Sequence, residues 1–247
     1  MQSQKQSQKR VSIREQPQWL RAGILLGNRF HFRHQHPSHH NRLNLSLLLS
    51  ILLGAGGLAY LGTQLPPLVF IPLGAFGFGL IYFMLFILVV HEASHQMFIV
   101  LKNLQQARRW NRLLGWMVCI PFGVEYVKHW EIGHSIHHLH PTTSADPQNC
   151  AETIYTGKPL FQKLAKDLLI PGYALLRIGH RCPAEQEYGS NRQLMMGAIG
   201  VWAVWLSLTT LYLSWAVAIA SLLGLQILVG LNTLKITMEH GGKLGQQ

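Results

Sequence analysis

The sequence has few charged residues, and two long stretches have none. Charged residues make up 13% of the chain, about half of the roughly 25% that is usual for a soluble domain. No Asp, Glu, Lys or Arg occurs in residues 43–91 or in residues 193–234. Both stretches are much longer than a buried helix of a soluble protein. The pattern excludes an ordinary cytosolic enzyme, a disordered chain and a disulfide scaffold, and it indicates an integral membrane protein.

Cysteine is scarce, and the amino-terminal region lacks an apolar core. The three cysteines, Cys119, Cys150 and Cys182, show neither paired nor CxxC spacing. They therefore predict free thiols in a reducing compartment, with no disulfide framework and no zinc–thiolate site. Residues 1–42 are polar and basic, which is unlike a secretory signal peptide. No recognition module for DNA or RNA is apparent, so we expect no nucleic-acid partner.

Each charge-free stretch is long enough for two membrane spans. A bilayer core about 30 Å thick requires about 20 helical residues. The first stretch is divided by the turn signal at residues 62–67, which contains Pro66 and Pro67. The second has no such breaker, and Ser214 is the best candidate for a tight turn, although one long or bent element is an alternative. The predicted spans are residues 44–63, 68–91, 194–213 and 215–234.

The distribution of basic residues predicts the orientation of these spans. All 21 Lys and Arg residues lie in residues 1–42, 92–192 and 235–247. Excess Lys and Arg marks cytoplasmic loops, so both termini and the middle region should be cytoplasmic. Membrane topology and anionic headgroups then account for the net charge of +11. The expected fold is all-α: four transmembrane helices as two hairpins, with a cytoplasmic histidine-rich region.

Two regions of different composition follow from this topology. Residues 1–42 form a basic, His-rich cytoplasmic segment, whose tract at residues 31–40 is expected to face water and lipid headgroups. Residues 43–247 form the membrane domain. Within it, the apolar stretch at residues 113–124 is too short to span. We expect this stretch to be re-entrant or to lie on the membrane surface.

Histidines gather where the predicted spans return to the cytoplasm. The second span ends in the motif HEASH, the cytoplasmic region contains HSIHH, and one further histidine lies just past the fourth span. Imidazoles four residues apart share a helical face, one turn from each other. An HxxxH motif alone is a weak signal, but the topology brings all three groups to one membrane boundary, where ionisable residues indicate function. The candidate metal ligands are His91, His95, His134, His137, His138 and His240.

The number of imidazoles bears on the metal. Imidazole suits zinc, copper, iron and nickel. Six exceed what one tetrahedral zinc would use, so two metals fit the count better. The Glu-x-x-His pairs of soluble di-iron bundles are absent.

The two motifs and the residues around them resemble a known superfamily. HEASH at the end of an apolar span, HSIHH about forty residues later and Asp146-Pro147 are similar to the histidine boxes of the membrane fatty acid desaturases, a superfamily that includes carotenoid ketolases and hydroxylases. The resemblance covers about residues 45–247 and includes His240. It implies that the six histidines hold two non-haem iron ions with O2 as co-substrate. It also implies that Glu92, His129 and His140 lie near the metals.

One part of the superfamily pattern is missing. Members carry a third box of HxxHH type after the fourth span, whereas no histidine follows His240 here. The expectation is therefore a truncated desaturase, a degenerate relative, or a protein completed by another chain.

The resemblance implies an oxygen-dependent fatty acyl desaturase of lipid metabolism that acts on a membrane lipid or acyl substrate. Electrons would come from a separate ferredoxin or cytochrome. A carotenoid ketolase or hydroxylase is the first alternative, and a truncated, catalytically inactive homologue is the second. A transporter is less favoured, because the histidines gather at one face and transport sites lie near the midplane.

Overall fold

All regular secondary structure in the described residues is helical. The computed structural model describes residues 18, 36–140, 146–147, 157–170 and 192–244, with side chains of the last helix as far as Lys235. Four helices in these residues are long and apolar enough to cross a membrane, which confirms the all-α, four-span prediction. These helices are Pro37–Gln64, Pro67–Ser94, Arg192–Tyr212 and Trp215–Lys235.

The first two spans meet at a short connector. Helix α2 (Pro37–Gln64) begins earlier than the predicted residue 44, because Pro37 occupies its first turn and the His36 side chain caps it. Helix α3 (Pro67–Leu85) starts after Leu65 and Pro66, within the predicted turn. It continues through the π-helical segment η3 (Phe86–His91) and the single turn α4 (Glu92–Ser94).

The last two spans are also separate helices. Helix α10 (Arg192–Tyr212) ends two residues before α11 (Trp215–Leu244) begins. The hydroxyl of Ser214 accepts a hydrogen bond from the Ala216 N–H at 3.2 Å. This side-chain cap explains why the chain breaks at Ser214 although no Pro or Gly is present.

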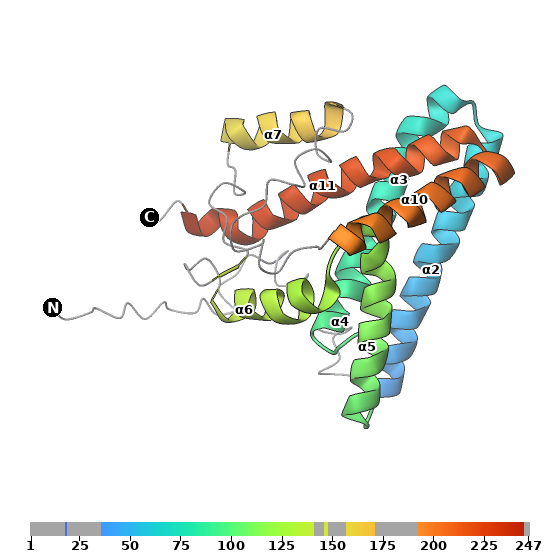
Figure 1. Ribbon diagram of the computed structural model, residues 1–247. Coiled ribbons are helices and arrows are strands. Elements are labelled where there is room, and N and C mark those ends of the chain that lie inside the picture. Colours follow the sequence, from blue (N-terminus) through green and yellow to red (C-terminus); the bar gives the residue numbers. More distant parts are fainter. Residues whose placement is uncertain (1–17, 19–35, 141–145, 148–156, 171–191, 245–247) are drawn as a thin grey trace.

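Helices α3 and α11 form the centre of the bundle, with α2 and α10 on its outside (Figure 1). The outer pair exposes most of its apolar side chains, as expected for surfaces that face lipid. Gly62 near the end of α2 packs against Phe70 of α3 and Val217 of α11. The two connectors therefore lie together at one end of the bundle, and His91 lies at the other end of the α3 helix.

The chain between the second and third spans forms shorter helices. These are α5 (Leu104–Cys119), η4 (Ile120–Phe122), η5 (Tyr126–Gly133), α6 (His134–Leu139) and α7 (Gly157–Leu169). The apolar stretch at residues 113–124 forms the second half of α5, η4 and Gly123, which adopts φ +64°. It is not among the span-length helices of the described residues, and its position relative to the membrane remains a prediction. The start of α5 at Leu104, where the Asn103 side chain caps the helix, was not predicted from the sequence.

A buried apolar cluster packs η3 and α4 against α5 and η5. It includes Val90, Ala93 and Phe98, none of which has exposed surface, and it is closed by Cys119 and Tyr126. This cluster fixes the end of the second span against the segment that carries HSIHH.

The close approach of α3 and α11 at Gly79 gives a first prediction. A Cβ at Gly79 would lie 3.0 Å from the Gly224 carbonyl oxygen and closer still to the Ile227 side chain. We expect Gly79→Ala to lower the free energy of unfolding by about 1–3 kcal/mol through overpacking. Gly56→Ala on α2 is the matched control, because a Cβ there meets nothing within 4 Å. Thermal denaturation in detergent measures both, and equal effects would contradict the packing described here.

Candidate metal centre

Two helical segments each present a pair of imidazoles. His91 ends η3 and His95 follows α4, while His134 begins α6 and His138 lies in its last turn. The spacing of four residues places each pair on one helical face. A π-helical segment, η3 or η5, directly precedes or includes the first histidine of each pair. Such segments are rare and frequently mark functional sites.

The two pairs face each other and form a compact group. The ring centroids are 4.8 Å apart for His91 and His95, and 4.5 Å apart for His134 and His138. Across the pairs, the rings of His91 and His134 are 5.0 Å apart, and those of His95 and His138 are 4.8 Å apart. One nitrogen of each ring lies within 4.8 Å of one nitrogen of every other ring. We call these four residues the histidine cluster.

The environment keeps two of these imidazoles uncharged. Burial, followed by the neighbouring imidazoles of His91 and His138, lowers the pKa of His134 to about 2. The same causes in the same order lower the pKa of His95 below its ordinary value. Neutral imidazole is the form that binds metals. The imidazoles of His95 and His134 are therefore in the form that can bind a metal at neutral pH.

The donor set fits a metal ion. The Nε2 atoms of His134 and His138 are 3.1 Å apart, a separation that two nitrogens on one ion also have when each lies about 2.0–2.1 Å from it. The other ring nitrogen of His134 is buried without a hydrogen-bond partner among the described residues. The candidate ligand nitrogens of all four imidazoles lie within 4.8 Å of one another, and four imidazoles are enough for a tetrahedral set.

His137 lies beside the cluster and has a carboxylate partner. Its Nδ1 is 2.9 Å from each carboxylate oxygen of Asp146, and both side chains are buried. Its ring centroid is 5.8 Å from that of His134 and 5.7 Å from that of His138. A carboxylate on one ring nitrogen fixes the orientation of an imidazole and raises its basicity toward a metal on the other.

The predicted ligands are thus only partly brought together. Four of the six form the cluster, His137 adjoins it, and His240 belongs to the part of α11 whose side chains lie outside the described residues. Among the residues expected nearby, the Glu92 carboxylate lies 3.3 Å from Nδ1 of His91. His140 ends α6 and is exposed.

An aromatic side chain that the sequence did not single out lies next to the cluster. The ring centroid of Trp130 lies 5.1 Å from that of His134 and 5.6 Å from that of His129. Its ring centroid is also 6.1 Å from that of Phe86 in the second span. Trp130 thus joins the cluster to the apolar interior of the bundle.

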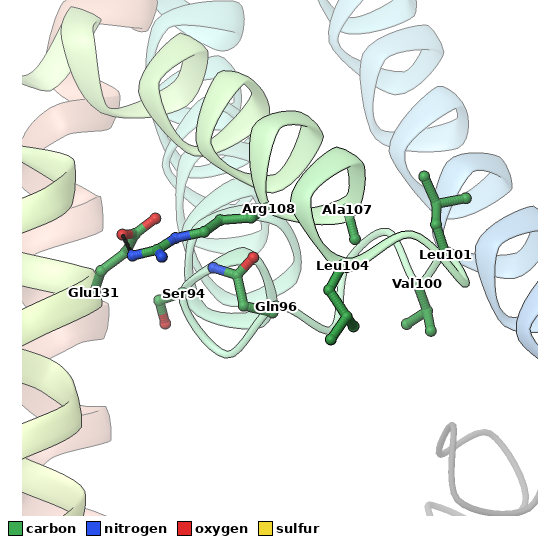
Figure 2. A pocket seen from close by; sticks show the side chains of 8 residues that line it. All are labelled: Ser94, Gln96, Val100, Leu101, Leu104, Ala107, Arg108 and Glu131. Carbon is green, nitrogen blue, oxygen red and sulfur yellow. Dashed lines mark ion pairs between the residues drawn. The ribbon is translucent and has the colours of Figure 1, made fainter.

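A cavity of about 400 Å³ lies beside the chain segment on either side of His95 (Figure 2). Ser94 and Gln96, which flank His95, form part of its wall, and Arg108 points toward Glu131 across it. Glu131 is also paired with Arg112 at 2.6 Å. No histidine of the cluster lines the cavity, so it is separate from the candidate metal centre.

Comparison with known proteins bears on the family. The model of the fatty acid desaturase family matches residues 65–244 of the chain. This range includes both histidine motifs and three of the four span-length helices, leaving α2 outside. No curated protein and no solved structure matches the chain.

The cluster predicts a measurable metal affinity. We expect His91→Ala and His138→Ala each to weaken binding of Co²⁺ at least tenfold, because each removes one of four donors. His39→Ala provides the control, since His39 is an exposed histidine in the first turn of α2. The affinities come from titrations followed by visible absorption. Equal Co²⁺ binding by all three variants and the wild type would show that the cluster is not the metal site.

The pair of His137 and Asp146 predicts a separate effect. Asp146→Asn retains the shape of the side chain and removes its charge, so Co²⁺ affinity should fall about 10–100-fold. Asp167→Asn is the comparison, because Asp167 is also buried but is paired with Lys163 on α7. If the two substitutions change Co²⁺ affinity to the same extent, His137 has no special part in metal binding.

Proposed function

The chain belongs to the fatty acid desaturase family, and we propose that it is a membrane-bound, oxygen-dependent oxidoreductase that introduces a double bond into a fatty acyl chain. The observation that carries this proposal is the convergence of two imidazole pairs at the end of a membrane span. The family match supports the desaturase class, and the four spans support a substrate that lies in the membrane.

The histidines of this chain would hold iron in two groups. His91, His95, His134 and His138 supply enough nitrogens for one ion. His137 and His240 are the candidates to extend the set toward a second ion. Iron would supply the oxidation of a methylene pair, with O2 as co-substrate. Overall, the acyl chain loses two hydrogens, and O2 takes up these and two further electrons and protons to give two water molecules.

The protein itself would position the substrate and exclude water. The ring of Phe122 in η4 contacts the rings of Tyr82 and Phe86 in the second span. Phe86 also contacts Trp130, which contacts His134. This series of rings forms an apolar boundary between the cluster and the membrane interior, and we propose that the acyl chain approaches along it.

The proposed topology places the cluster at the cytoplasmic face. Two hairpins with cytoplasmic termini agree with the distribution of Lys and Arg. His138 is exposed, and His91 lies near the end of the second span that is opposite the connector. A ferredoxin or cytochrome on the cytoplasmic side would then deliver electrons to the metal centre.

A product assay tests this function. Cells that express the protein are given a fully deuterated saturated fatty acid, and their lipids are examined by mass spectrometry. We expect an unsaturated product that lacks two deuterium atoms, and we expect His95→Ala to abolish it because a ligand is lost. His39→Ala should leave the product unchanged.

Other results of the same experiment would redirect the proposal. Oxygenated carotenoids in a carotenoid-producing host, without new acyl double bonds, would favour a ketolase or hydroxylase. Absence of any product, together with at most one iron per purified chain, would favour an inactive homologue. About two irons per chain would support the proposed enzyme.

A further inference from the structure

The chain makes an unusual turn directly after His95. The N–H of Met97 donates to the Glu92 carbonyl at 2.8 Å, and that of Gln96 donates to the Ala93 carbonyl at 3.0 Å. This pair of hydrogen bonds is the Schellman motif, which normally has Gly at the left-handed position. Here Gln96 occupies that position with φ +60°. A non-glycine residue in this conformation is strained, so other contacts must hold the turn in place.

The contacts come from side chains of α2 and α5. Residues 97–100 have no regular structure, yet each of their four carbonyl groups accepts a hydrogen bond from a side chain. His40 donates to Met97 at 2.6 Å, Asn44 to Phe98 at 2.9 Å, Asn111 to Ile99 at 2.8 Å and Asn41 to Val100 at 2.8 Å. We call residues 97–100 the clamped segment.

Two of the asparagines bind the clamped segment through both ends of their amide groups. The Oδ1 atom of Asn41 accepts from the Val100 N–H at 2.9 Å, and that of Asn111 accepts from the Ile99 N–H at 3.0 Å. Each amide group thus pairs with the backbone as a neighbouring β-strand would. The two asparagines come from different helices, Asn41 from α2 and Asn111 from α5. Asn111 is fully buried. Loss of such an amide would leave two backbone groups unpaired.

The clamped segment follows closely after the helix end that carries His91 and His95 of the cluster. His95 lies two residues before it, and its own N–H donates to the His91 carbonyl at a long 3.3 Å. His95 is the C-cap residue of α4, at the end of the continuous helix Pro67–Ser94, so helical hydrogen bonds hold it from one side only. Phe98 anchors the segment in the apolar cluster together with Ala93. The position of the His95 ring therefore depends on how the segment after it is held.

We propose that Asn41 and Asn111 are positioning residues of the metal centre, which hold the clamped segment so that His95 faces the other three imidazoles. The inference rests on the proposed function, because it requires that the histidine cluster binds metal. It adds the first span to the centre, although that span contributes no histidine to the cluster and lies outside the matched range of the family.

Binding of Co²⁺ to the full-length protein in detergent tests the proposal. Asn41→Leu removes both hydrogen bonds to Val100, and Asn41→Asp keeps the acceptor while losing the donor. We expect the affinity for Co²⁺ to fall at least tenfold in Asn41→Leu and by a smaller factor in Asn41→Asp. We also expect the visible absorption bands of bound Co²⁺ to shift, because the ligand geometry changes. Asn111→Leu should act in the same direction.

The matched control is Asn103→Ala. The Asn103 side chain caps α5 by accepting from the Gln106 N–H at 3.1 Å, and its loss should lower the melting temperature without changing Co²⁺ affinity. All three variants, Asn41→Leu, Asn41→Asp and Asn103→Ala, could lower the melting temperature and still keep the wild-type Co²⁺ affinity and spectrum. In that case the hydrogen bonds to the clamped segment serve stability alone, and the inference is overturned. Should the wild-type protein itself bind no Co²⁺, the proposed metal function fails first and the inference fails with it. Graded loss of affinity at Asn41, with Asn103→Ala unchanged, supports the proposal even if Asn111→Leu does not fold.

Discussion

The end of the second span and the short helix α6 face each other, and each carries two imidazoles one turn apart. The rest of the structure depends on this constraint. Four imidazole nitrogens can converge only if both helical segments keep their rotation and their separation. Burial lowers the pKa of His134 to about 2 and thereby keeps its imidazole in the neutral form that can bind a metal. The buried Nδ1 of His134 has no hydrogen-bond partner among the described residues, and a buried polar group of this kind costs free energy unless a ligand binds it.

The surrounding elements can be understood as supports for these two helices. The apolar cluster around Phe98 and Tyr126 fixes their separation. The asparagines of α2 and α5 hold the chain after His95, and the Asp146 carboxylate holds His137. The spans themselves place this assembly at one end of the bundle, away from both connectors (Figure 1). The membrane domain and the candidate centre are therefore parts of one structure.

The sequence predicts the spans well because the bilayer imposes a simple requirement on length and charge. It also predicts which histidines share a face, since a spacing of four residues is a local property. It does not predict the π-helical segments, or that α6 directs His137 toward Asp146. The contacts of Asn41 with Val100 could not be predicted from the sequence either, because they join residues that are 59 positions apart and depend on tertiary packing. Of the six ligands implied by the desaturase resemblance, four lie together in the histidine cluster and His137 adjoins them, whereas the side chain of His240 lies outside the described residues.

X-ray absorption spectroscopy of the iron-loaded protein in detergent tests the central claim most directly. The outer-shell scattering of an imidazole ring is distinctive, so the spectrum reports how many histidines bind iron. The account predicts iron with at least four imidazole nitrogens, and fewer of them in His134→Ala. Iron bound mainly by oxygen ligands, with a spectrum that His134→Ala leaves unchanged, would contradict it.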